Sequence, residues 1–275
     1  MPRSKEELIF SANSLQAFAD CERRFELNYL DELKWPAVET EPVLKSEHFL
    51  ADGRRFHEMI HQDLLGIPVM EPSLVDEPEL AAWWQNYRDH DPIKAYGQQY
   101  PEKTLVSTIK DRLLVATYDV FVVTEEGKVT IYDWKTWRKP HAFQWVKQQM
   151  QSRIYPLVIY QERASIPGAD NLKFEDIEMR YWYANFPDES VSFKYSEDQY
   201  LADKAVLELI IDRIDSLPPG EFELTSELAK CTYCPFRSYC DRGSVAGSIE
   251  EHDVEDSAGG DSLFGNLDDY ESIAF

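Results

Sequence analysis

Residues 131–138 read IYDWKTWR, which places an acid and a lysine two positions apart inside a segment with the composition of a β-strand. On such a strand Val129, Ile131, Asp133 and Lys135 share one face, because side chains alternate across a strand. An inward acid and base at the end of an apolar row cost free energy unless they pair or bind something. The stretch therefore indicates either a structural ion pair at a strand end or a functional site.

A second strand-like segment comes just before this one. The segments RLLVATYDVFVV and VTIYDWKT, joined by TEEGK, predict a β-hairpin with a glycine-containing loop. If the loop is 124–128, Val123 faces Val129 and Asp119 faces Asp133. Opposed side chains lie roughly 5 Å apart. The pattern thus predicts that Asp119, Asp133 and Lys135 converge at one end of a sheet.

Helical patterns surround this hairpin. Apolar residues at helical spacing predict helices over 11–29, 47–65, 143–160 and 197–216, and alternation predicts a second hairpin from 177–186 and 191–196. Residues 67–101, with five prolines, are expected to form an insertion that contains a short helix. This order of elements predicts an α/β fold with a mixed central sheet flanked by helices.

The charge of the chain is strongly acidic. Twenty-eight basic and 51 acidic residues give a net charge of -23, which by itself argues against a nucleic-acid partner. Nine of the acids lie in residues 243–275, which contain no lysine or arginine and are expected to form a disordered tail. Without these nine charges the expected folded domain, 1–242, still carries -14.

The chain shows no sign of export or membrane insertion. Its first residues, MPRSKEELIF, lack the apolar core of a signal peptide, and no apolar run reaches membrane-spanning length. We therefore expect a cytoplasmic protein. Four cysteines in such a protein are expected to be ligands or thiols rather than disulfides.

The acid pair and lysine have the chemistry of a hydrolytic site. Two facing carboxylates repel each other, and a hard divalent cation such as Mg²⁺ or Mn²⁺ would cancel that repulsion. Lys135 would then be placed to orient or deprotonate the attacking water and to stabilise charge on a phosphate. His57, from a neighbouring helix, could add a nitrogen ligand, or could be an ordinary hydrogen-bonded histidine.

The cysteines form a second group. Cys231, Cys234 and Cys240 have the spacing C-x2-C-x5-C, and Cys21 lies far upstream. Four thiolates complete a [4Fe–4S] cluster or a structural zinc site. Such a site would join the N-terminal helix to the C-terminal segment. Unbound reduced thiols are the alternative.

Together these features resemble a known family. The order of SLQAFADCERRFELNYL, GRRFH, Asp119, DWKT, QSRIY and CTYCPFRSYC resembles the PD-(D/E)XK nucleases of the RecB type. More narrowly, it is similar to the iron–sulfur branch, which includes the nuclease domain of AddB and CRISPR-associated adaptation nucleases. The resemblance spans residues 11–242 and implies a restriction-endonuclease-like fold with an iron–sulfur staple between the two ends of the domain.

The resemblance also implies roles for individual residues. Lys135 would be the catalytic lysine, and Gln151 and Tyr155 would position the water, the lysine or the DNA strand. The remaining assignments are a metal site formed by His57, Asp119, Asp133 and the carbonyl of Trp134, and a [4Fe–4S] site formed by Cys21, Cys231, Cys234 and Cys240. Glu102 is a weaker match to an acidic position of the family. Ala116 stands where the family usually has glycine, three positions before the motif acid.

The leading hypothesis is a divalent-metal-dependent deoxyribonuclease acting on single strands or DNA ends. Repair, recombination and CRISPR adaptation are the pathways that the resemblance implies, with a helicase or integrase as a possible partner protein. The alternative is a non-catalytic docking module that recruits partners through DSLFGNLDDYESIAF, in which apolar residues alternate with acids.

Overall fold

The fold is built on one five-stranded sheet. We describe residues 4–33, 41–139, 141–232 and 234–243 of a computed structural model, excluding the side chains of 41–47. The strands lie in the order β1-β2-β3-β4-β5, and every neighbouring pair is antiparallel except β3 and β4, which are parallel. They are β1 (Gln98–Ile109), β2 (Arg112–Val123), β3 (Val129–Lys135), β4 (Ile177–Tyr183) and β5 (Ser190–Lys194).

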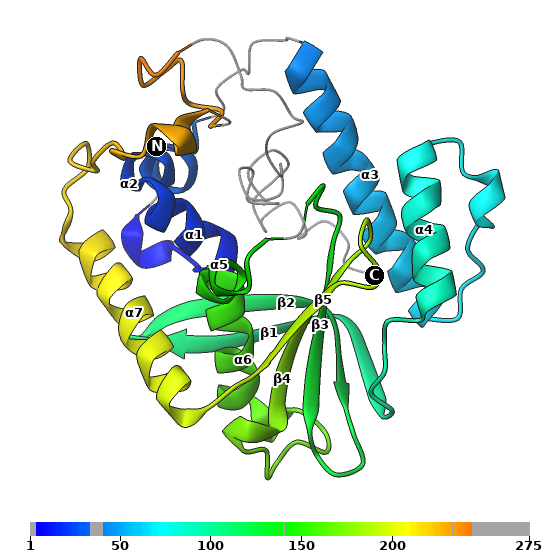
Figure 1. Cartoon of the computed structure of the whole chain (residues 1–275). Helices are drawn as coiled ribbons and strands as arrows, with labels where there is room; N and C mark the ends of the chain where they lie inside the picture. Colours follow the sequence, from blue (N-terminus) through cyan, green and yellow to red (C-terminus); the bar gives the residue numbers. More distant parts are fainter. Residues whose placement is uncertain (1–3, 34–40, 140, 233, 244–275) are drawn as a thin grey trace, which may run out of the picture.

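Helices lie on both faces of this sheet (Figure 1). The described α-helices are α1 (Ala12–Asp20), α2 (Glu22–Phe25), α3 (Glu41–Leu64), α4 (Pro78–His90), α5 (Phe143–Gln148), α6 (Met150–Gln161) and α7 (Glu197–Ser216). Shorter helical segments are η1 (Lys5–Glu7), the π-helical η2 (Glu26–Leu30), η3 (Pro72–Leu74), η4 (Arg163–Ser165), η5 (Phe174–Asp176) and η6 (Leu228–Cys231). The expected α/β architecture with a mixed sheet flanked by helices is confirmed. Within the described residues, no helix is both long and apolar enough to cross a bilayer.

Two apolar clusters hold the helices to the sheet. On one face, α1, α6 and α7 pack against residues such as Ile131 and Met179. On the other face, α3 and α4 pack against Val120, Tyr132 and Trp134. Successive residues of β3 therefore belong to different clusters, as the alternation of a strand requires. Consecutive side chains at the end of β3 therefore face different layers of helices.

The β2–β3 hairpin has the register that the loop length predicts. Val123 pairs with Val129, and the ladder continues to Val120 opposite Tyr132. Gly127 has φ 77°, a left-handed conformation that glycine adopts at little cost, and it lies in the turn closed by the Thr124 amide and the Lys128 carbonyl. The next position of this register would oppose Asp119 and Asp133. The strands separate there.

The β1–β2 ladder is interrupted at the same level. Pro101 pairs with Val120 and Lys103 with Tyr118, whereas Glu102 between them has a left-handed φ of 46°. Tyr118 belongs to the cluster under α6, and Val120 belongs to the cluster under α3, so β2 changes face between them. Asp119 lies at this kink of β2, where the pairing of β2 with both β1 and β3 is interrupted.

Several elements differ from the sequence prediction. The helix expected over 11–29 breaks at Cys21, which has an extended backbone, and the helix expected over 143–160 breaks at Gln149 for the same reason. The segment 67–101, expected as an insertion, contains the predicted short helix as α4, but its last residues begin β1, which was not predicted. Trp83 and Trp84 of α4 are buried in the cluster with α3. The expected tail is outside the described residues from 244 onward.

Candidate active site

The candidate active site lies where β2 and β3 separate. The residues come from four elements: His57 from α3, Asp119 from β2, Asp133 and Lys135 from β3, and Gln151 and Tyr155 from α6. Because the two helices approach from opposite faces of the sheet, the site needs the whole layered fold. The structure brings these six predicted residues into one neighbourhood.

Asp119 is held by groups on both sides of it. Its Oδ1 lies 3.1 Å from Nδ1 of His57, and its Oδ2 accepts a hydrogen bond of 2.7 Å from the Trp134 amide. The predicted role of Trp134 used its carbonyl, and the contact described here is made by its N–H. This hydrogen bond connects β2 to β3 where the two strands have separated, and it fixes the Asp119 carboxylate beside β3.

Asp133 is the most deeply buried acid of the site, with 2% of its surface exposed. Its Oδ1 lies 3.0 Å from the Lys135 ammonium, and its Oδ2 accepts a hydrogen bond from the Gln151 amide. The ion pair that the strand pattern allowed is therefore present. Lys135 also faces the Trp137 ring, with Nζ 5.5 Å from the ring centre.

Tyr155 lies one helical turn after Gln151, on the same side of α6. Its ring packs against Tyr118 with centroids 4.7 Å apart, and the Tyr118 hydroxyl donates to its backbone carbonyl at 3.0 Å. Burial, followed by the charges of Asp133 and Asp119, raises the pKa of Tyr155 well above its usual value. The phenol therefore stays protonated at neutral pH, where it can orient its neighbours but cannot act as a base.

The carboxyl groups have different proton affinities. Burial and the charge of Asp119 raise the pKa of Glu102 to about 7, although solvent still reaches its side chain. Burial also raises the pKa of Asp133, against the opposing charge of Lys135. For Asp119, burial is outweighed by the charge and hydrogen bond of His57 and by the Trp134 amide, so its pKa is lowered. Asp119 is the carboxylate most firmly held in its charged form.

These side chains are paired with one another. Among the described residues, no group of three histidine, cysteine, aspartate or glutamate side chains has a metal-binding arrangement. Carboxylates and an imidazole are nevertheless suitable ligands for a hard divalent cation. His57, Asp119 and Asp133 would hold such a cation, which would compensate the charge of the two carboxylates.

Metal affinity is expected to rise with pH through about 7. A carboxyl group must lose its proton before it binds a metal ion. Because the pKa of Glu102 is about 7 and that of Asp133 is also raised, protons compete with the metal below this pH. Calorimetric titration of Mn²⁺ across this range measures the effect. Glu102→Gln should weaken the pH dependence, and an affinity independent of pH would contradict the expectation.

The cysteines line a second pocket at the junction of the chain ends. Cys21, Cys231, Cys234 and Cys240 all border it. Burial raises the pKa of the Cys234 thiol, and it raises that of Cys240 to about 11 with help from the neighbouring sulfurs. Hydrogen bonds between protein groups also join the segment that contains Cys21 to the segment that leads to Cys231. One of them runs from the Arg23 amide to the Glu223 carbonyl at 3.0 Å. A ligand bound by these thiols stays a prediction.

The sequence analysis did not identify every residue that lines the site. Trp137 and Arg24 border a groove that begins at Lys135. Trp137 follows Lys135 at the strand spacing of two, a signal that was available but carries no chemistry by itself. Arg24 is more than a hundred residues away in sequence, so only the fold could bring it to the same groove.

The family comparison agrees with this geometry. A sequence model of the PD-(D/E)XK nuclease superfamily matches residues 9–241. The chain therefore belongs to the PD-(D/E)XK nuclease superfamily.

Solved structures show a more distant similarity. A protein of Eubacterium rectale named as a candidate exonuclease has 13% identity and a TM-score of 0.48, with 92% of each chain covered. The protein SSO0001 has 14% identity and a TM-score of 0.42, covering 86% of this chain and 88% of its own. No curated protein matches the chain significantly.

Proposed function

We propose that the chain is a divalent-metal-dependent deoxyribonuclease that hydrolyses phosphodiester bonds in single strands or at DNA ends. The observation that carries the proposal is the meeting of Asp119, Asp133 and Lys135 where β2 and β3 separate. In a member of a nuclease superfamily, intact acids and an intact lysine at this point favour catalysis over a purely structural ion pair.

The donor groups fit a divalent ion. His57, Asp119, Asp133 and the carbonyl of Trp134 would hold it, and Glu102 is near enough for its charge to affect the same carboxylates. The raised pKa values of Glu102 and Asp133 are due first to burial and in part to the nearby charge of Asp119. When bound, the ion would supply Lewis acidity and neutralise charge developing on the phosphate.

The protein side chains would perform the remaining work. The Lys135 ammonium lies at the edge of the acid pair, where it can stabilise developing charge on a phosphate oxygen. Gln151 holds the Asp133 carboxylate by a hydrogen bond, so the orientation of that acid does not depend on the lysine alone. Tyr155 is kept protonated by burial, and its side chain interacts with Gln151 and helps to orient it.

The acidic composition limits how tightly DNA is bound. A net charge of -23 opposes association, so we propose that a metal ion and a few local basic side chains hold the phosphate chain, that affinity therefore falls with salt, and that a helicase or integrase delivers the substrate in the cytoplasm. Repair, recombination and CRISPR adaptation are the proposed settings.

The cysteine pocket is proposed to hold a [4Fe–4S] cluster, as in the RecB-type iron–sulfur branch. Four thiols from distant parts of the chain border one pocket, and the raised pKa of Cys240 is partly due to the other sulfurs. Bringing thiols together in this way is unfavourable for thiolates unless a positive ion compensates their charge. A zinc ion bound by the four cysteines would compensate the thiolate charges in the same way.

The test is cleavage of labelled single- and double-stranded DNA by anaerobically purified protein in Mg²⁺, Mn²⁺ or a chelator. Asp119→Asn keeps the shape of the side chain but removes the best-ionised carboxylate, and it should lower the rate by a factor on the order of 10² or more. Asp111→Asn, at the β1–β2 turn, is the matched control. Metal-independent cleavage, or equal cleavage by Asp119→Asn, would contradict the proposal. No cleavage by the unmodified protein would favour the docking module.

A further inference from the structure

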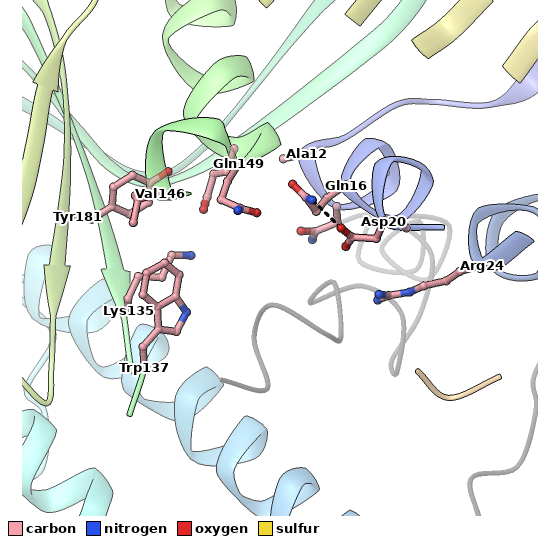
Figure 2. Close-up of a pocket in the computed structure, with 12 residues that line it drawn as sticks. Ala12, Gln16, Asp20, Arg24, Lys135, Trp137, Val146, Gln149 and Tyr181 are labelled. Atoms are coloured by element: carbon pink, nitrogen blue, oxygen red, sulfur yellow. Dashed lines mark hydrogen bonds between the residues drawn. The ribbon is translucent and has the colours of Figure 1, made fainter. Parts of the chain in front are cut away.

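A groove leads away from Lys135 along the N-terminal helix. It is bordered by α1 on one side and by the ends of β3, α5 and α6 on the other (Figure 2). Lys135 and Gln151 form its inner end, and Arg24 lies at its outer end. Its position makes it continuous with the candidate active site, so a polymer bound for cleavage could extend along it.

Trp137 presents a hydrogen-bond donor to this groove. The side chain is 2% exposed, and its Nε1 has no hydrogen-bond partner among the described residues. In Figure 2 the indole nitrogen faces the same open space as the Lys135 amine. Leaving a buried donor unpaired is unfavourable, and a ligand with an acceptor oxygen would remove that cost.

Arg24 supplies a cation on the opposite side of the groove. It is 7% exposed, and in Figure 2 its guanidinium points back toward Lys135 and Trp137. Asp20, an acid that borders the groove, accepts a hydrogen bond of 3.1 Å from Gln16 and lies 3.4 Å from the Lys230 ammonium. Lys230 adds a positive charge beside Asp20, and two cations, Lys135 and Arg24, border the groove in an otherwise acidic protein.

The anchoring of Gln16 keeps the groove in shape. Its Oε1 accepts a hydrogen bond of 3.0 Å from the Met150 amide at the start of α6, while its Nε2 donates to Asp20. The helix α1, from which the chain continues through Cys21 into α2 with Arg24, is thereby fixed to α6, which carries Gln151. One wall of the groove is therefore preorganised, which lowers the entropic cost of binding a flexible strand.

We propose that this groove binds a phosphate of one nucleic-acid strand, adjacent to the phosphate being cut, through the Trp137 indole N–H and the Arg24 guanidinium. The inference rests on the proposed nuclease function and adds the path of the strand. Trp137 is a neutral donor and Arg24 a charged one, so their contributions respond differently to salt.

The test compares Trp137→Phe, which retains an aromatic ring but removes the donor, with Trp145→Phe. Trp145 packs against Trp137 with ring centres 5.7 Å apart and does not border the groove. Affinity is measured by fluorescence anisotropy with labelled oligothymidylate in a chelator, and KM and kcat are measured in Mg²⁺. Trp137→Phe should weaken affinity and raise KM about tenfold with little change in kcat, and Trp145→Phe should leave them unchanged.

The salt dependence gives a second, independent measurement. Arg24→Gln should reduce the slope of log affinity against log salt by about one, whereas Trp137→Phe should leave the slope unaltered. Thermal melting shows whether each variant is folded. Unchanged affinity in Trp137→Phe, or an equal loss in Trp145→Phe, would overturn the inference. Because binding is measured without metal, an absence of cleavage by the unmodified protein would refute the proposed function while leaving the groove testable.

Discussion

Replacing Lys135 by alanine is expected to lower the rate of DNA cleavage by a factor on the order of 10²–10³. The ammonium lies 3.0 Å from Asp133 and is only 15% exposed, so it is held beside the site acids and largely shielded from solvent. Its loss removes positive charge where negative charge develops on the phosphate. The measurement is kcat at saturating Mg²⁺ on labelled single-stranded DNA.

Metal binding should survive this substitution. Without Lys135 the Asp133 carboxylate loses its cationic partner, so its demand for a divalent ion increases above the pH at which it ionises. Calorimetry should thus give a Mn²⁺ affinity in Lys135→Ala that is equal to or higher than that of the unmodified protein. A variant that binds metal but cuts slowly would separate the role of the lysine from that of the acids.

The matched control is Lys128→Ala, at the opposite end of β3. Lys128 is an exposed residue of the β2–β3 turn, 4.0 Å from Glu126. Both substitutions remove one lysine charge, but only Lys135 contacts the site acids. Comparable cleavage by Lys135→Ala and Lys128→Ala would rule out a catalytic lysine, whereas a loss confined to Lys135→Ala would support one.

The part of the site made by the β2–β3 hairpin was predictable from sequence. Its geometry depends on local features of the sequence, namely the alternation of apolar residues and the length of the loop 124–128. These features lead to the pairing of Val123 with Val129. A short loop fixes the register, and the register brings Asp119 toward Asp133. For these residues the sequence contains enough information to place the acids at the same end of the hairpin, although the ladder ends at Val120 and Tyr132, one position before the predicted pair.

The rest depends on contacts between distant segments. The parallel pairing of β3 with β4 is set by the helices between them, and no short-range pattern encodes it. Glu102 was missed as part of a strand because β1 carries polar residues on both sides of it and has a left-handed residue at the kink. The same irregularity places its charge near Asp119. A prediction based on strict alternation of apolar and polar residues therefore fails at Glu102, where the site departs from regular strand geometry.

The groove beside Lys135 was even less predictable from the sequence, because it too depends on contacts between distant segments. Trp137 is next to the predicted motif, but its role depends on an indole nitrogen that has no hydrogen-bond partner in the described part of the chain, which the sequence alone does not show. Arg24 reaches the groove because Cys21 breaks the first helix and redirects the chain into α2. A continuous helix, as the sequence pattern predicted, would have placed Arg24 elsewhere.

Substituting Cys234 by serine is expected to remove the bound metal or cluster and to destabilise the protein by on the order of 5 kcal/mol. Cys21 and Cys231 are separated by more than 200 residues, so a ligand joining them restricts the unfolded chain strongly. Replacing a buried but unliganded thiol by a hydroxyl would cost only about 1–3 kcal/mol. The free energy of unfolding in denaturant and the iron and zinc contents distinguish the two cases.

Thr232→Ser, in the same segment between two of the cysteines, is the matched control and should retain both metal and stability. Visible absorbance with iron in the unmodified protein would identify an iron–sulfur cluster, and one zinc without absorbance would identify a zinc site. In either case Cys234→Ser should lose the metal. If the unmodified protein contains neither metal, and Cys234→Ser changes stability by no more than a buried hydroxyl, the two ends are joined by protein contacts alone, such as the hydrogen bond from Arg23 to Glu223. The staple would then be refuted while the acid–lysine site, which shares no residue with it, would be unaffected.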